Sequence, residues 1–117
     1  MQAASVSTDA NGDLLVVLHG DIDFTSSPSV LQVIRAEAAN AAPSGIRVDL
    51  ADVTFMDSSG ISVLVQLLHL AEQRRVTLRL ENVGSKVRDQ LHIAGLSELF
   101  GLAAPSGWLA TPGEDLS

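Results

Sequence analysis

The chain has 117 residues, 46 % of them hydrophobic but only 3 % aromatic, so we expect one domain with a core of Leu, Val, Ile and Ala. Fourteen acidic residues against seven Lys and Arg give a net charge of −7, and no basic stripe offsets it. This balance repels phosphate backbones, and we predict no nucleic-acid partner.

The first predicted elements are two strands in a hairpin. Leu14–Leu18 is a short apolar run, typical of a strand that is buried on both faces. A weaker strand at about Ala4–Thr8 can pair with it through the turn residues Asn11-Gly12.

A helix is predicted next, after the acidic turn Gly20–Asp23. Ser27 as N-cap and Pro28 at the first helical position indicate its start, because proline lacks an N–H that would have no partner there. The segment Asn40–Gly45 ends the helix. Its inward positions follow helical spacing and are Val30, Val33, Ile34 and Ala38.

The second half of the chain again alternates strand and helix. Strands are predicted from Ile46 to about Met56 and over Val76–Leu80, with a helix between them that follows the turn Asp57–Gly60. Ser85 is predicted to cap a third helix, which ends at a left-handed Gly95. The inward residues of this helix and its exit are predicted to be Val87, Leu91, Ala94, Leu96, Leu99 and Phe100.

This order of elements predicts an α/β fold with a small mixed sheet of four to five strands, mostly parallel, and helices packed against it. We expect a single domain over residues 1–110, with a last short strand at Trp108-Leu109, and a disordered tail over 111–117. The chain has no cysteine, which excludes disulfides and thiolate metal sites. No segment resembles a signal peptide or a membrane span, so we expect a cytoplasmic protein without membrane association.

The second helix is apolar over a wide arc. One stripe contains Ile61, Leu64, Val65 and Leu68, and a second beside it contains Val63, Leu67 and Leu70. One sheet face cannot cover both stripes. Two interpretations, which do not exclude each other, are that neighbouring helices cover the excess and that part of it stays exposed beside Ser58 as a docking patch.

The turn Asp57–Gly60 has several interpretations. A serine between strand and helix is an ordinary N-cap. A hydrolase nucleophile elbow would need glycine where the chain has Met56, and no triad partner is assigned among His19, His69 and His92. An aspartyl-phosphate site at Asp57 would need Mg²⁺ and a nearby cation, for which Asp21, Asp23 and Lys86 are the candidates. We expect no enzymatic activity, no metal and no cofactor.

The segment Asp49–Ile61 resembles the signature of the STAS family, in particular the bacterial anti-sigma factor antagonists. The turn Gly20–Asp23 and the segment Ala94–Phe100 agree with the same family, and the resemblance covers about Leu14–Phe100. Family members usually carry a final amphipathic helix, for which residues 103–117 are too rich in proline and glycine.

The resemblance implies a STAS-like fold and a phosphorylation-controlled switch that regulates transcription. Ser58, which follows the aspartate of the signature, would be phosphorylated by the cognate anti-sigma factor, which doubles as a serine kinase. A PP2C-type phosphatase would remove the phosphate. The unphosphorylated form would bind the anti-sigma factor and release the sigma factor. The alternative is a STAS-type scaffold or sensor-complex binding domain, in which Ser58 only caps the helix.

Individual roles follow from this resemblance. Ser58 is predicted as the acceptor and Ser59 as the helix cap, while Gly60 would allow close approach of a partner or kinase. Asp23 either faces the partner or stabilises an Asx-type turn. A phosphate on Ser58 would meet free N–H groups at the helix start, and its charge would block docking without a large rearrangement. The predicted partner-binding residues are Asp23, Asp57, Ser58, Ser59, Gly60 and Ser62.

Overall fold

The computed structural model describes residues 4–102. They belong to two compact units, one within Met1–Gly84 and one within Ser85–Ser117. The predicted strand at Trp108-Leu109, the disordered tail and the missing final helix lie outside the described residues. The single domain over residues 1–110 stays a prediction.

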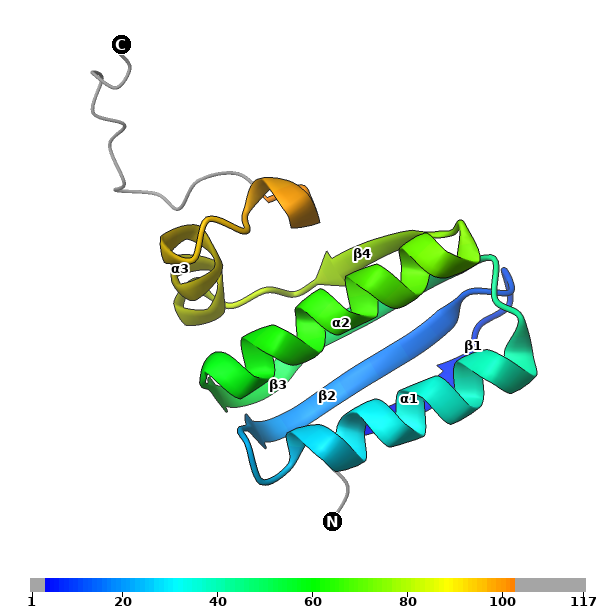
Figure 1. The fold of residues 1–117 in the computed structure, drawn as a ribbon, viewed down its shortest axis with the longest axis horizontal. Coiled ribbons are helices and arrows are strands. Elements are labelled where there is room, and N and C mark those ends of the chain that lie inside the picture. Colours follow the sequence, from blue (N-terminus) through cyan, green and yellow to red (C-terminus); the bar gives the residue numbers. More distant parts are fainter. Residues whose placement is uncertain (1–3, 103–117) are drawn as a thin grey trace, which may run out of the picture. The chain divides into compact units, whose positions relative to one another are not determined.

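The first unit contains a four-stranded mixed sheet with the strand order β1-β2-β3-β4 (Figure 1). β1 and β2 pair antiparallel as a hairpin, while β2–β3 and β3–β4 are parallel. The predicted α/β fold class, the hairpin and the mostly parallel pairing are therefore confirmed. The strands are β1 (Ala4–Thr8), β2 (Leu14–Ile22), β3 (Gly45–Met56) and β4 (Thr77–Glu81).

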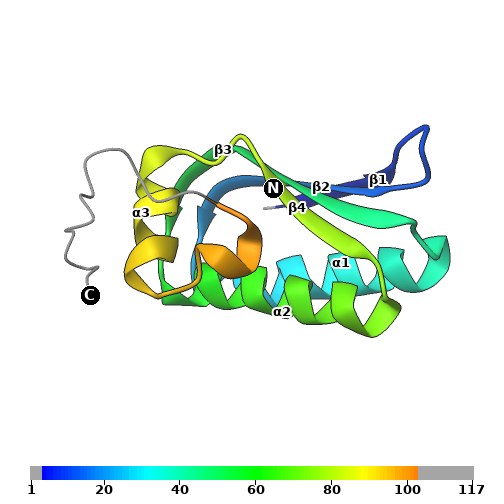
Figure 2. The same ribbon diagram turned by 90° about the horizontal axis from the view of Figure 1, so that it is seen from above.

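Two long helices, α1 (Ser27–Ala41) and α2 (Ser58–Arg74), lie side by side on one face of this sheet (Figure 2). α1 packs over β1 and β2, and α2 over β3 and β4. At their carboxyl ends Arg74 donates a hydrogen bond of 3.1 Å to the carbonyl oxygen of Ala38. Because each helix follows a parallel strand, both helices begin at the carboxyl edge of the sheet.

The core lies between the sheet and the two helices. Leu14, Val16 and Leu18 of β2 are fully buried against the helices, while the alternate residues Leu15 and Val17 are only half-buried. The prediction that this strand is buried on both faces is therefore wrong. α1 and α2 cover only one face of β2. On the other face, neighbouring side chains of the sheet partly shield Leu15 and Val17, so these positions can still be apolar.

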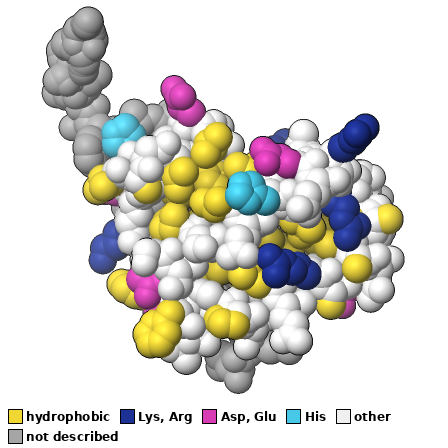
Figure 3. Space-filling model, viewed as in Figure 1, with side chains coloured by type: hydrophobic (Ala, Val, Ile, Leu, Met, Phe, Trp, Pro, Cys, Tyr) yellow, Lys and Arg dark blue, Asp and Glu magenta, His cyan; other side chains and the backbone are white. Residues whose placement is uncertain are grey.

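α2 divides its wide apolar arc between the core and the surface. Val63, Leu64, Leu67 and Ala71 are buried, whereas the flanking apolar positions are half-buried. Hydrophobic side chains accordingly remain visible on this side of the molecule (Figure 3). The half-buried positions are Ile61, Val65, Leu68 and Leu70.

The second unit contains α3 (Ser85–Ile93) and a 3₁₀-helix, η1 (Glu98–Phe100). Gly95 has a φ of +76°, as predicted for the residue that ends this helix. Val87, Leu91 and Phe100 are buried as predicted. The inward positions of Ala94 and Leu99 were predicted wrongly, since both are exposed, and Ser85 is the first helical residue rather than the cap.

Within residues 4–102, no helix has both the length and the apolar character required to cross a bilayer.

The sheet face opposite the helices carries an ion-pair network around Arg47. Its guanidinium donates to Asp9 at 2.8 Å and to both carboxylate oxygens of Glu81 at 3.0 and 2.9 Å. Hydrogen bonds from Arg47 and from the backbone of Asp13 and Asn11 lower the pKa of Asp9. One arginine thus joins the hairpin loop to β3 and β4.

In the Arg47→Gln variant the free energy of unfolding should decrease less steeply with falling pH than in the wild type. The pKa of Asp9 in the folded chain lies below its ordinary value of 3.8, so the stabilisation from this carboxylate is complete above that value. This stabilisation is lost as the pH falls through the lower pKa of Asp9 in the folded chain. Without Arg47 that pKa is lowered less, so the free energy of unfolding decreases less over the same pH range. Urea unfolding between about pH 5 and about pH 2 measures the slope. Lys86→Gln, at an exposed cation that forms no ion pair within residues 4–102, is the matched control, and equal slopes for the wild type and Arg47→Gln would contradict this account.

Candidate functional site

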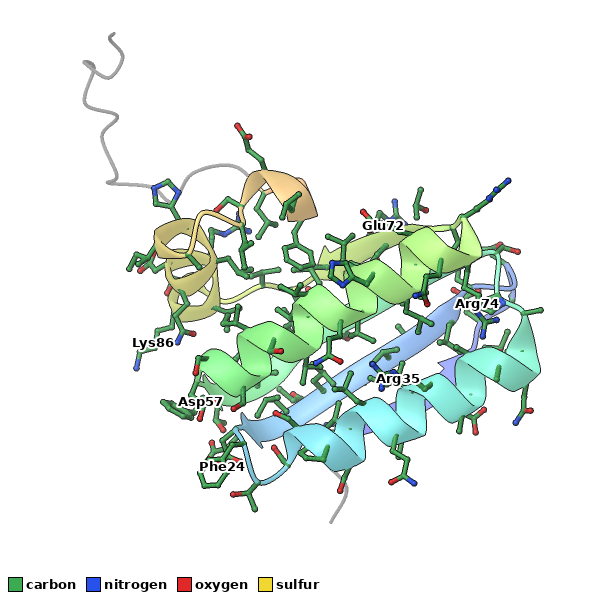
Figure 4. All side chains as sticks on the ribbon, viewed as in Figure 1. Phe24, Arg35, Asp57, Glu72, Arg74 and Lys86 are labelled. Atoms are coloured by element: carbon green, nitrogen blue, oxygen red, sulfur yellow. The ribbon has the colours of Figure 1, made fainter. Side chains whose placement is uncertain are left out.

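The two turns singled out in the sequence lie next to each other at the carboxyl edge of the sheet. β2 ends at Ile22 and β3 ends at Met56, and these two residues are partners in the parallel ladder. The N–H of Asp57 then donates to the carbonyl oxygen of Ile22 at 3.4 Å. The turn into α1 and the turn into α2 are therefore neighbours, and Figure 4 shows Phe24 and Asp57 at the same end of the two helices.

Asp57 is the N-cap of α2. It has an extended backbone, and its Oδ1 accepts from the N–H groups of Ser59 and Gly60 at 2.8 and 3.3 Å. The prediction that Ser59 caps the helix is wrong, because Ser59 donates its N–H and the carboxylate of Asp57, two residues earlier, is the acceptor. The aspartate side chain thus satisfies two of the N–H groups that a helix start leaves without partners.

Ser58 is the first helical residue and is exposed. Among the described residues its hydroxyl group has no hydrogen-bond partner, so the interpretation of Ser58 as a plain cap does not hold. An exposed hydroxyl at the first position of a helix is accessible to a modifying enzyme. The capping aspartate beside it fixes the backbone that presents it.

Gly60 lets α2 start directly against the strand ends. A Cβ atom on Gly60 would lie 2.6 Å from the carbonyl oxygen of Ile22 and would clash with the side chain of Met56. Any side chain would therefore push the helix start away from β2 and β3. This internal role accounts for the glycine, and its predicted role toward a partner or kinase stays a prediction.

Asp23 organises the neighbouring turn. Its Oδ1 accepts from the N–H groups of Thr25 and Ser26 at 3.0 and 3.1 Å, which is the predicted Asx-type geometry. Its carbonyl oxygen accepts from the N–H and the hydroxyl of Ser27 at 2.8 and 2.6 Å. The N-cap of α1 is Ser26 instead of the predicted Ser27. Asp23 and Asp57 thus play matching parts in adjacent turns.

Two phenylalanines beside these turns were not identified from the sequence. Phe24 is 76 % exposed and Phe55 is 53 % exposed. Phe55 directly precedes the buried Met56 in β3, so its side chain lies on the opposite face of the sheet. An apolar residue directly after the Gly20–Asp23 turn was the available signal for Phe24.

A groove of about 610 Å³ runs between α1 and α2 and starts beside this turn. Its lining includes Ser59 and Ser62, two of the predicted partner-binding residues, together with Phe24. The structure thus brings the predicted residues to one region, either in the two adjacent turns or at the adjoining groove.

The two catalytic interpretations require a partner for Ser58 or Asp57, and within residues 4–102 neither side chain is hydrogen-bonded to a histidine. His19, on the sheet, lies 3.2 Å from the hydroxyl of Ser5 and 3.6 Å from the carboxylate of Asp52. His69 is exposed on α2. Within residues 4–102, no three His, Asp or Glu side chains gather where they could hold a metal ion. The Asp57 carboxylate itself is bound to its own helix start.

The STAS domain model matches residues 5–107. The chain belongs to the STAS domain family. The anti-sigma-B factor antagonist of Bacillus subtilis (strain 168) is 31 % identical over 96 residues, which are 80 % of this chain and 84 % of that protein.

Solved structures show the same STAS fold. An anti-sigma factor antagonist from Mycobacterium paratuberculosis aligns with a TM-score of 0.71 and 26 % identity, over 88 % of this chain and 86 % of that one. The antagonist SpoIIAA in its unphosphorylated form gives 0.73 and 21 %, over 86 % and 88 % of the two chains. Its phosphorylated form, from Bacillus, gives 0.68 and 20 %, over 86 % and 91 %. At these identities, the two SpoIIAA structures support the fold alone.

In this STAS domain the segment Asp49–Ile61 comprises most of β3, the cap Asp57 and the start of α2. The family and fold predicted from that segment are confirmed. The binding roles of the individual residues stay predictions.

Asp57→Ala should destabilise the domain by about 1 kcal/mol, because the N–H groups of Ser59 and Gly60 lose their acceptor. Ser59→Ala should change the free energy of unfolding by less than about 0.5 kcal/mol, since its side chain makes no capping bond. Urea unfolding measures both, with Asp57→Asn as a control that keeps an acceptor oxygen. A larger loss for Ser59→Ala than for Asp57→Ala would contradict this assignment.

Proposed function

We propose that this STAS domain is an anti-sigma factor antagonist whose binding is controlled by phosphorylation of Ser58. The observation that carries the proposal is the exposed Ser58 hydroxyl, which has no hydrogen-bond partner within residues 4–102 and lies at the first position of α2 directly after the capping Asp57. The similarity to the anti-sigma-B factor antagonist of Bacillus subtilis supports an anti-sigma factor as the partner. The domain is then a kinase substrate and a binding protein, and it performs no chemistry of its own.

The exchange would take place in the cytoplasm. The unphosphorylated domain binds an anti-sigma factor, and the sigma factor is released. The same anti-sigma factor, acting as a serine kinase, transfers phosphate from ATP to Ser58, and the complex dissociates. A PP2C-type phosphatase restores the binding form. The solved phosphorylated form of SpoIIAA shares this fold, in keeping with a phosphate that the fold tolerates.

The geometry of the turn explains why a phosphate would act on docking. A phosphoserine adds about −1.5 to −2 charges and strong acceptor oxygens. The N–H groups of Ser59 and Gly60, which could have received it, are already bound to Asp57. The expectation that the phosphate meets these groups free is therefore wrong. Its charge stays at the surface, beside the acidic turns, and repels or desolvates a partner that approaches there.

Incubation with ATP and a candidate anti-sigma factor kinase should label the protein at Ser58, because that hydroxyl is exposed. Phosphopeptide mass spectrometry locates the label and should find an occupancy in the source cells that changes between growth and stress. Ser58→Ala abolishes the label, whereas Asp57→Asn retains it. A label that survives Ser58→Ala but not Asp57→Asn would indicate an aspartyl phosphate, and a bare Ser58 under every condition would favour the scaffold.

Ser58→Ala should bind the anti-sigma factor with or without ATP, and Ser58→Asp should bind it about tenfold or more weakly, through like-charge repulsion. Isothermal titration calorimetry measures both affinities. Because the effect is local, both variants should keep an unfolding free energy within about 0.5 kcal/mol of the wild type. Equal affinities of the two variants would exclude the switch and leave a binding domain without phospho-cycling.

A further inference from the structure

The groove between α1 and α2 is lined by both apolar and polar side chains. Leu31 and Pro28 line it from α1 and Val63 from α2, while the exposed ring of Phe24 stands at its start. Phe24 is the most exposed large hydrophobic residue among those described. An exposed aromatic ring at the mouth of a partly apolar groove is the arrangement found at the centres of protein interfaces.

A cation lines the groove, and acidic residues lie outside its lining, in the two turns near its start. Asp21, Asp23 and Asp57 belong to the turns beside its start, and Arg35 lines it between the helices (Figure 4). Arg35 donates a hydrogen bond of 2.8 Å to Oε1 of Gln66, across the groove. Ser59 and Gln66 are about 10 Å apart along α2 at roughly 1.5 Å per residue. The end of the groove beside Ser58 and the end at Arg35 are thus separated by about two helical turns.

Arg35 forms no ion pair within residues 4–102, although acidic residues outnumber basic ones two to one in the chain. Its one hydrogen-bond partner is a neutral amide. Arg47, by comparison, is paired with two carboxylates. The Arg35 guanidinium therefore retains donors that an incoming carboxylate can use, which gives the groove an electrostatic polarity.

The groove is continuous with the phosphorylation site. Ser59, the residue after Ser58, lines its start, and Ser62 lies one helical turn further. The hydroxyl of Ser62 accepts from Nε2 of Gln66 at 3.3 Å, so a line of hydrogen bonds runs along α2 from Arg35 to within one turn of Ser58. A segment in the groove would reach Ser59, the neighbour of the serine that carries the switch.

We propose that this groove receives one segment of the anti-sigma factor, with a defined direction. An apolar side chain of that segment inserts between Leu31 and Val63 and packs on Phe24. A carboxylate of the same segment binds Arg35, and an uncharged part of it lies at the turns next to Ser58, where an added phosphate would oppose docking. The inference rests on the proposed function and adds the chemistry of the partner segment to it. Phosphorylation then blocks the Ser58 end, and Arg35 contributes affinity at the other end.

The test uses purified full-length protein and the anti-sigma factor that labels Ser58 with ATP. Phe24→Ala and Arg35→Glu should each weaken binding about tenfold, whereas Phe24→Leu keeps most of the affinity. Arg35→Glu should raise the KM for phosphorylation of Ser58 and leave kcat nearly unchanged, because Arg35 acts in docking away from the acceptor hydroxyl.

Arg79→Glu is the matched control for charge reversal, since Arg79 is exposed on β4 in the row of side chains that faces away from α1 and α2. It should change affinity by no more than about twofold. The chain has no cysteine, so a photo-crosslinker can be attached at a single site. Gln32→Cys, in the groove, should crosslink to the anti-sigma factor, and Arg79→Cys should not.

Two outcomes would overturn the proposal, and they are distinguishable. If Phe24→Ala and Arg35→Glu bind like the wild type while Ser58→Asp does not bind, the switch stands and the groove is not its docking surface. If no anti-sigma factor labels Ser58 or binds the unphosphorylated chain, the proposed function fails and the groove inference fails with it. Unfolding midpoints near that of the wild type verify that each variant is folded.

Discussion

The parallel pairing of β2 with β3 determines where every residue of the site lies. The ladder advances by one residue on β3 between Val17 and His19 and again between Gly20 and Asp21. Each single shift exchanges the faces of the sheet, so two shifts return Ile22 and Met56 to the buried face. Both strands therefore end together, and the turns into α1 and α2 meet. Without the second shift, Met56 would not be buried next to Ile22.

Close contact at this edge also depends on Gly60. Its lack of a side chain allows the first turn of α2 to rest on the carbonyl oxygen of Ile22. The carboxylates of Asp23 and Asp57 then hold their turns by accepting backbone N–H groups. In consequence, the carboxylates of Asp23 and Asp57 are engaged in holding the two turns, whereas the side chain of Ser58 is exposed.

The sequence predicted most of the fold because strand and helix periods are clear and the turns carry glycine, proline and aspartate at characteristic places. It failed where the outcome depends on tertiary contacts. Ser59 and Asp57 are equally good cap residues by type, and only the extended backbone of Asp57 decides between them. The apolar run Leu14–Leu18 predicted a strand buried on both faces, but α1 and α2 cover only one face of the sheet, and Leu15 and Val17 on the other face are half-buried.

The site was predicted in part, for similar reasons. The signature identified Ser58 and its neighbours because they are consecutive in the chain. Phe24 and Arg35 belong to α1 and its preceding turn, and their position beside α2 follows from helix packing, which local patterns do not encode. The orientation of Phe55 follows from its alternation with the buried Met56 in β3, but its exposure depends on which face of the sheet α1 and α2 leave uncovered.

The capping arrangement has a consequence for how a phosphate would act. Helix starts commonly bind anions through free N–H groups, and a phosphate bound in that way would be partly neutralised by the domain itself. Here Asp57 already occupies the N–H groups of Ser59 and Gly60. These two N–H groups are therefore not free to bind a phosphate on Ser58, and more of its charge would act outward on whatever approaches the turn. A cap built from a neutral serine would weaken this effect, because its hydroxyl could give way to the phosphate, whereas a carboxylate adds its own repulsion to it.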